Sequence, residues 1–171
     1  GLYSFQWTKD FAEGSFDAVI GNPPYINAIQ LTKTVGEDVK DYWKKKYKSA
    51  KGTYDIYILF FEQALRVCKD GGYVAFITPN KYLSSPYGLA LREFISKNYK
   101  LVKILDLSSV KVFEDPSVYP IVTIIQKVKP MKKYTIITEK MFSENQRDKK
   151  VCYVSSDNLT KLPESIWGII L

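Results

Sequence analysis

Short apolar stretches alternate with helical patterns along most of the chain. Apolar stretches bounded by turn residues predict buried strands at four places: 16–20, 73–78, 101–107 and 121–126. Apolar residues that recur every three or four positions predict helices over 55–68 and from Ser85 to about Lys97. This order predicts an α/β fold with a mostly parallel sheet. Because no helix separates the last two strands, we expect them to pair as an antiparallel edge.

The remaining segments give weaker patterns. Residues 37–51 (EDVKDYWKKKYKSAK) have some helical character but are dominated by lysines and aromatic residues, so we expect an exposed segment. Residues 134–138 and 151–155 predict two further small strands. At 171 residues the chain is long enough for one domain with a hydrophobic core.

The first predicted strand runs directly into a stiff loop, in the stretch DAVIGNPPYIN. Two consecutive prolines end the strand and fix the backbone there. In open α/β sheets, ligands bind outside the carboxyl ends of the strands, which is where this loop lies. The side chain of Asn22 and the backbone of Pro23 both offer carbonyl acceptors, and together they match a planar NH2 group with two donors.

Such a pair of acceptors suits one kind of chemistry. An exocyclic amine on a base is a poor nucleophile because its lone pair is delocalised into the ring. Acceptors that hold both hydrogens favour a tetrahedral nitrogen, and this is preorganised electrostatic catalysis. Tyr25 could stack on one face of the base, a contact of about 1–3 kcal/mol. A merely stiff turn is the alternative reading of the same four residues.

Composition narrows the possible functions. The chain has no histidine, which excludes Ser-His-Asp and Cys-His catalysis and histidine-containing zinc sites. The net charge of +7 comes from lysine more than from arginine, and this favours a polyanion partner without base readout. A basic, soluble surface explains the charge equally well. Cys68 and Cys152 do not form a disulfide framework, so we expect a reducing cytoplasm.

The motifs resemble those of the gamma-class, TaqI-like adenine-N6 DNA methyltransferases, which include fused type II restriction–modification enzymes. FDAVIGNPPYI resembles motif IV of the methyltransferases that act on amines. GTYDIYILFFEQALRVCKDGGYVAFITPNKYL and LREFISKNY resemble the segments that follow it, and KVFEDPSVYPIVTIIQK is similar to motif VIII. Motif IV is widely shared, whereas its combination with the segment around Phe113 is more specific. The resemblance covers roughly residues 1–128.

The resemblance implies a Rossmann-like fold, S-adenosylmethionine as cofactor and a flipped adenine in double-stranded DNA as substrate. Asn22 and Pro23 would accept from the adenine amine, while Tyr25 and Phe113 would contact the two faces of the base. Asn22, Pro24 and Phe60 would lie against the cofactor. Core packing remains the alternative for Phe60, and a loop aromatic packed on the sheet for Phe113.

A lysine-rich segment follows the candidate site in the chain. Lys44, Lys45, Lys46 and Lys48 alternate with aromatic residues and predict a surface that faces DNA phosphates. A solvated face is the alternative for such a run of charges.

Part of the family pattern is absent from the sequence. No Gly-x-Gly precedes Asn22, and the acidic residue that holds the cofactor ribose in the family is also missing. We therefore expect residues 1–128 to be the catalytic half of a methyltransferase domain. Residues 129–171 would be an extension toward a target-recognition domain, and the chain alone would be inactive. No nuclease motif stands out, and an attached endonuclease is left open.

Two other functions fit the same loop. An amino-methyltransferase for protein glutamine or for an RNA base faces the same problem of a weak NH2 nucleophile. A non-catalytic module for DNA binding or assembly is the second alternative, which the intact Asn22–Tyr25 loop disfavours.

Overall fold

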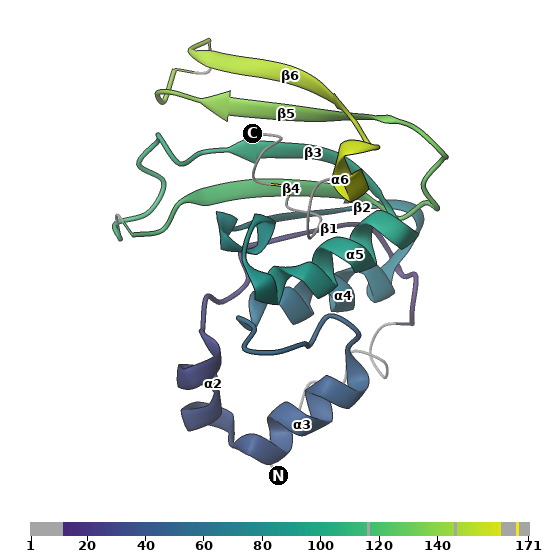
Figure 1. Ribbon diagram of the computed structural model, residues 1–171, viewed down its shortest axis with the longest axis vertical. Helices are drawn as coiled ribbons and strands as arrows, with labels where there is room; N and C mark the ends of the chain where they lie inside the picture. Colours follow the sequence, from purple (N-terminus) through teal and green to yellow (C-terminus); the bar gives the residue numbers. More distant parts are fainter. Residues whose placement is uncertain (1–11, 116, 146, 162–166, 168–171) are drawn as a thin grey trace.

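One six-stranded sheet organises the chain. The computed structural model describes residues 12–115, 117–145, 147–161 and 167 (Figure 1). In the sheet the strands lie in the order β1-β2-β4-β3-β5-β6. Their bounds are Phe16–Gly21 (β1), Cys68–Pro79 (β2), Lys100–Asp106 (β3), Pro120–Gln126 (β4), Thr135–Met141 (β5) and Lys149–Ser155 (β6).

Strand direction confirms the expected α/β fold with a mostly parallel sheet. β1 pairs parallel to β2, and β3 parallel to β5. β4 is antiparallel to both β2 and β3, so β1, β2, β3 and β5 share one direction. β6 opposes β5.

One detail of the predicted topology is wrong. The strands at 101–107 and 121–126 do pair antiparallel, as expected, but β4 lies inside the sheet rather than at its edge. β4 (PIVTIIQ) is apolar on both faces, and its buried and half-buried residues alternate, which suits an interior strand. Connectivity along the chain alone could not show that β4 also pairs with β2.

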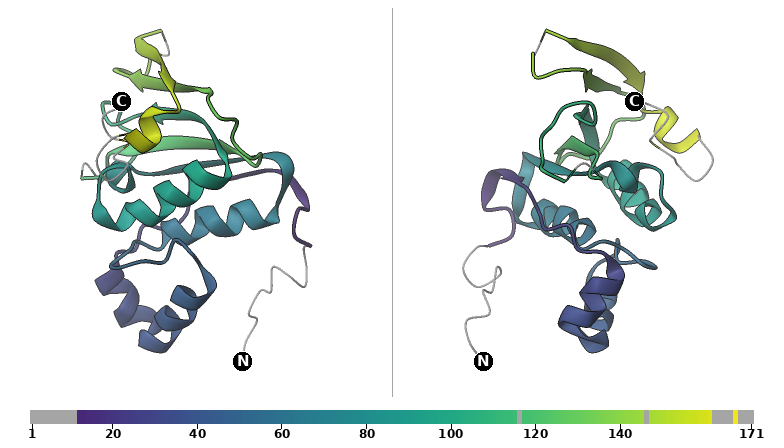
Figure 2. Two further views of the ribbon diagram at one scale, coloured as in Figure 1. Left: turned by 45° about the vertical axis from the view of Figure 1, so that its right-hand side comes forward. Right: turned by 90° about the vertical axis from the view of Figure 1, so that its left-hand side faces the viewer.

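The expected helices form, and α4 and α5 pack on one face of the sheet (Figures 1 and 2). The segment 37–51, expected to be exposed with some helical character, contains α3, which has no buried residue. The expectation of exposure is wrong after α3, because Tyr47, Ser49 and Ala50 are buried. The α-helices have these bounds: Ala28–Val35 (α2), Glu37–Lys46 (α3), Tyr57–Val67 (α4), Leu89–Asn98 (α5) and Asn158–Lys161 (α6). The 3-10 helices are Asn80–Leu83 (η1) and Pro86–Gly88 (η2).

Thr53 or Asp55 is the N-cap that the sequence predicts for the helix over 55–68, and Ser85 the one for the next helix, but none of them makes a capping bond. Neither Asp55 nor Thr53 caps α4, which begins at Tyr57, because the turn before it is closed by the backbone bond from Ile58 N to the Asp55 carbonyl. Ser85 likewise makes no capping bond, since a 3-10 turn opening with Pro86 comes between it and α5. In both places a tight turn takes up the residues that the helical pattern alone would assign to the helix.

The 129–171 segment continues the same sheet. β5 and β6 both lie within it, so the sheet crosses the predicted boundary at residue 128. The boundary itself and the role of the extension remain predictions, and residues 1–11 of the predicted catalytic half lie outside the described residues. Among the residues described, every helix is too short or too polar to cross a bilayer.

Buried polar contacts fix the turn that follows β2. The Tyr82 hydroxyl in η1 lies 2.6 Å from the hydroxyl of Thr123 on β4. The buried Arg92 guanidinium on α5 donates to the carbonyls of Tyr82 (2.6 Å) and Ser85 (2.9 Å). These bonds hold the carboxyl end of β2, which is where the candidate site lies.

Removing the Tyr82 hydroxyl should therefore destabilise the fold. We expect Tyr82→Phe to lower the free energy of unfolding by about 1–3 kcal/mol, because the buried Thr123 hydroxyl loses its partner. Urea unfolding followed by circular dichroism measures the change. Tyr153→Phe is the control, since its ring is 74% exposed and its loss should change stability very little. Equal stability of the two variants would contradict a stabilising role for the bond between Tyr82 and Thr123.

Candidate active site

The Asn22–Tyr25 loop lies at the carboxyl edge of the two parallel strands β1 and β2. β1 ends at Gly21 and the loop follows at once. The Asn22 side chain is exposed, Pro23 is buried, and Tyr25 is half-buried. The Asn22 amide is thus accessible at the sheet edge, as a binding role for it requires.

Tyr25 links the loop to the sheet. Its hydroxyl lies 2.6 Å from Asn22 Oδ1 and 3.1 Å from the carbonyl oxygen of Ile77 on β2. Burial raises the pKa of Tyr25, so the hydroxyl stays protonated and can donate at neutral pH. The Asn22 acceptor is therefore engaged by the chain itself in this state.

The structure brings Phe113 next to Tyr25, although the two residues are far apart in the sequence. Their ring centroids lie 5.9 Å apart with an interplanar angle of 82°. A base stacked between two rings needs a slot in which the rings lie roughly parallel on either side of it. The edge-to-face arrangement leaves no such slot, so a base can enter only if one ring turns.

A chain of three polar side chains lies behind the Tyr25 ring. Tyr57 packs edge-on against Tyr25 with centroids 6.2 Å apart. The hydroxyls of Tyr57 and Tyr87 are 2.8 Å apart, and Tyr87 donates to Asp55 Oδ2 at 3.0 Å. Because the single Tyr87 proton points to Asp55, Tyr57 must be the donor to Tyr87.

Burial raises the pKa values of the three side chains in this hydrogen-bonded series. It raises the pKa of Asp55, although the bond from Tyr87 opposes the shift. It raises the pKa of Tyr87 to about 12 and that of Tyr57 also far above its usual value, so both hydroxyls remain donors. Sequence analysis placed neither Tyr57 nor Tyr87 at the site. The polar Asp55 just before an apolar helix was the available signal.

Phe60 has an unusual position on a buried helix. Its neighbours Leu59 and Phe61 are buried, whereas the Phe60 side chain is 39% exposed. Core packing thus does not account for the whole ring. An exposed aromatic face of this kind fits a role in packing against a planar ligand.

The lysines predicted to face DNA lie away from these rings along the chain. Lys44, Lys45 and Lys46 form the last turn of α3, and Lys48 follows it. All four side chains are exposed. The structure leaves their predicted role open.

The helices described leave one face of the sheet uncovered. α4 and α5 lie on the same side, and in the described residues no helix crosses the other side (Figure 2). Ile20 on the edge strand β1 is 81% exposed, and Tyr73 on β2 is also exposed. All-parallel sheets are normally covered on both faces, whereas the described residues cover one face of this mixed sheet with helices.

Comparisons with known proteins identify a family and a shared fold. Residues 1–113 match the model of the Eco57I restriction-modification methylase family. The type II restriction enzyme and methyltransferase RM.Eco57I of Escherichia coli is 32% identical over 118 residues, which are 69% of this chain and 12% of that enzyme.

Solved structures share the fold. The type IIG restriction endonuclease BpuSI matches 95% of this chain, and 21% of its own, with a TM-score of 0.65 and 19% identity. A Listeria monocytogenes protein described as a class I S-adenosylmethionine-dependent methyltransferase covers 76% of this chain and 38% of its own, with a TM-score of 0.58 and 22% identity.

The chain spans only about an eighth of the Escherichia coli relative and a fifth of BpuSI. The family model nevertheless covers most of the chain, including both the loop at Asn22 and the ring at Phe113. The chain belongs to the Eco57I restriction-modification methylase family.

Proposed function

We propose that this chain carries the target-base half of an S-adenosylmethionine-dependent methyltransferase that modifies the N6 amine of adenine in DNA, as part of a restriction–modification enzyme. One observation carries the proposal. The Asn22 amide is exposed at the carboxyl edge of parallel strands, the Tyr25 hydroxyl bonds it, and the Phe113 ring packs against the Tyr25 ring.

The loop residues would activate the amine without a general base. Asn22 Oδ1 and the Pro23 carbonyl accept the two N–H groups, which directs the nitrogen lone pair away from the protein. The chain has no histidine to serve as a base, and this mechanism needs none. Tyr25 and Phe113 stack on the flipped base and offset part of the few kcal/mol that unstacking costs.

The residues present fit one side of a cofactor site. Phe60 on α4 and Pro24 in the loop both expose apolar surface, and the Asn22 side chain is also exposed. These three residues would hold S-adenosylmethionine, which supplies a methyl group activated on a sulfonium centre.

The rest of the cofactor site must come from elsewhere. Within the residues that the structure describes, β1 is an edge strand with an exposed Ile20, and one face of the sheet carries no helix. These features support a cofactor-binding part that packs on this side. A target-recognition domain would follow residues 129–171. Without these parts the chain would be inactive, so methyl transfer by the isolated chain would refute this point.

The substrate would be double-stranded DNA, and the four lysines near the end of α3 would contact its phosphates. Restriction–modification relatives favour DNA over protein glutamine or RNA. The two free cysteines fit a reducing compartment, and we propose the cytoplasm.

Substituting Asn22 tests the central step. We expect Asn22→Ala in the full-length protein to lower kcat by about 10²–10³-fold, the usual effect of losing one preorganised hydrogen-bonding group, while DNA affinity is retained. Transfer of a labelled methyl group to an adenine-containing duplex, followed by nucleoside analysis, measures both the rate and the modified atom.

Asn27→Ala is the matched control for this experiment. The Asn27 side chain lies in the same segment but accepts from Gln30 N as the cap of α2. We expect nearly normal turnover. Equal losses in both variants, or a label found on cytosine, would contradict the proposal.

The contact between Tyr25 and Asn22 leads to a second prediction. The Tyr25 hydroxyl occupies the acceptor that the base amine needs, so the two compete. We expect Tyr25→Phe to lower KM for DNA by about 2- to 10-fold, equivalent to one hydrogen bond, because stacking is kept and the competitor is lost. Steady-state methylation kinetics measure the change.

Tyr57→Phe separates this competition from general disturbance of the aromatic cluster. It removes the bond to Tyr87 but leaves the contact with Asn22 intact. KM should not fall in this variant. A higher KM for Tyr25→Phe would show that the hydroxyl assists base binding instead.

A further inference from the structure

Residues 28–53 form a long insertion that begins and ends at the candidate site, and we call it the arm. It leaves the loop at Asn27, which caps α2. It returns where Ile56 N donates to the Ile26 carbonyl at 3.0 Å. Ile26 follows Tyr25 in the chain and Ile56 precedes Tyr57, so the arm is rooted between two rings of the site. α2 and α3 project from the body of the molecule (Figure 1).

The end of the arm is strongly basic. Residues 42–51 contain five lysines and no acidic residue. Lys44 pairs with Asp41 at 3.0 Å, and Lys46 lies over the rings of Tyr42 and Tyr47. Lys45 and Lys48 are exposed and make no ion pair with any residue that the structure describes. Their charges are available to a partner.

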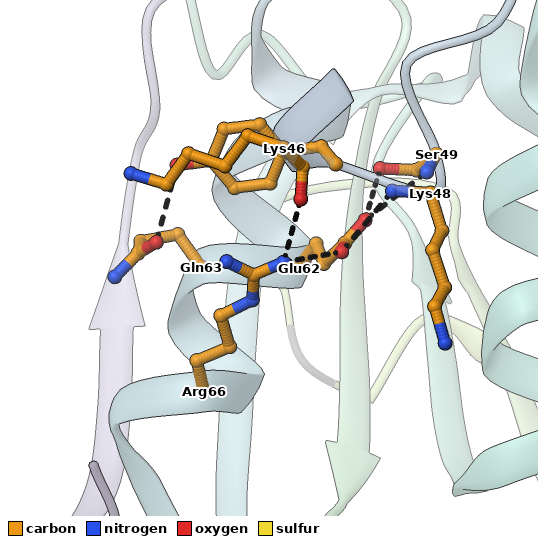
Figure 3. A network of polar contacts seen from close by, with 7 residues as sticks. Lys46, Lys48, Ser49, Glu62, Gln63 and Arg66 are labelled. Carbon is orange, nitrogen blue, oxygen red and sulfur yellow. Dashed lines mark hydrogen bonds and ion pairs between the residues drawn. The ribbon is translucent and has the colours of Figure 1, made fainter. Parts of the chain in front are cut away.

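A buried carboxylate on α4 holds the backbone of this basic segment (Figure 3). Glu62 is only 2% exposed. It accepts from Lys48 N at 3.2 Å, from Ser49 N at 3.0 Å and from Ser49 Oγ at 2.9 Å. Two successive peptide groups thus point at one buried charge.

Arg66 completes the anchor one turn along α4. It pairs with Glu62 at 2.9 Å and donates to the Lys46 carbonyl at 2.9 Å. Its guanidinium also lies 5.0 Å from the centre of the buried Tyr47 ring, whose hydroxyl bonds Gln63. The backbone from Lys46 to Ser49 is therefore fixed on a core helix.

We infer that Glu62 is a positioning residue, which holds the lysine end of the arm as a rigid surface for the phosphate backbone of the nucleic acid whose base enters the site. This inference rests on the proposed function. Burying a carboxylate is costly unless it is fully paired. A run of lysines that only faced solvent would not need a buried carboxylate to hold its backbone. Preorganised lysines lose less conformational entropy when they bind phosphate than mobile ones do.

The test compares salt dependence of binding in the full-length protein. The affinity for a duplex with one target adenine is measured by fluorescence anisotropy at several salt concentrations. We expect the double variant Lys45→Ala and Lys48→Ala to reduce the salt slope by about 2, one for each lost phosphate contact. We expect Glu62→Gln to reduce the slope with both lysines present, because its amide places N–H groups against the donors of Ser49 and Arg66.

Coupling between the changes is the decisive readout. If Glu62 acts through the lysines, the lysine changes will cause little further loss in the Glu62→Gln background. Additive losses, or a wild-type slope for Glu62→Gln, would overturn the inference. Glu93→Gln is the matched control, since Glu93 forms an i,i+4 pair with Lys97 on α5 that is exposed, and its slope should be unchanged.

Hydrogen exchange separates positioning from global unfolding. In Glu62→Gln, faster exchange should be confined to residues 28–53, while the sheet stays protected. If the sheet also opens, Ser49→Ala removes one donor to Glu62 more mildly and should show a smaller loss of slope with the same coupling to the lysines. Absence of that coupling would count against the inference.

The two proposals can fail separately. Normal adenine methylation with no effect of the lysines on the salt slope would remove the arm from DNA binding and leave the proposed function standing. If the Glu62 and lysine changes affect the salt slope in a coupled way but no adenine is methylated, the arm's role in DNA binding stands and the proposed function fails.

Discussion

The rigid loop from Asn22 to Tyr25 is the constraint on which the rest of the site depends. Its two prolines carry no N–H, so the loop cannot continue the sheet and instead presents acceptors at the carboxyl edge of β1. The surrounding structure holds it in place. The Ile77 carbonyl on β2 lies within hydrogen-bonding distance of the Tyr25 hydroxyl, and Ile26 receives the backbone bond from Ile56. A small displacement of β1 against β2 would therefore disturb the positions of Asn22 and Tyr25.

The site satisfies its own polar groups. The Asn22 oxygen, which accepts from an amine in the proposed function, is engaged by the Tyr25 hydroxyl, and the hydroxyls of Tyr57 and Tyr87 lead to Asp55. Because Asn22 is exposed, the proposed exchange of the Tyr25 hydroxyl for a base amine leaves no buried polar group unpaired, while the buried Tyr57 keeps its bond to Tyr87. Selectivity for an NH2 group follows, because a base edge without donors could not replace the lost bond.

Local sequence patterns were sufficient for much of the fold, because strands such as β2 and the helix α4 are defined by their own apolar spacing. The loop at Asn22 could also be placed, since it directly follows a strand. Phe113 was expected near the base only through family resemblance, and the structure does bring it to Tyr25. The interior place of β4 and the partners of Glu62 could not be predicted, because both depend on contacts between segments distant in sequence.

The position of the arm relates phosphate binding to base binding. A flipped base must reach Asn22 while its own backbone is held, and both contacts must be satisfied by one nucleotide strand. If the lysines were mobile, the backbone could bind in many registers, and few of them would place the base at the loop. Because Glu62 lies on α4, the helix that also carries Tyr57 and Phe60, the basic surface and the aromatic site share one rigid support. The buried carboxylate is thus best understood as setting the distance between phosphate and base.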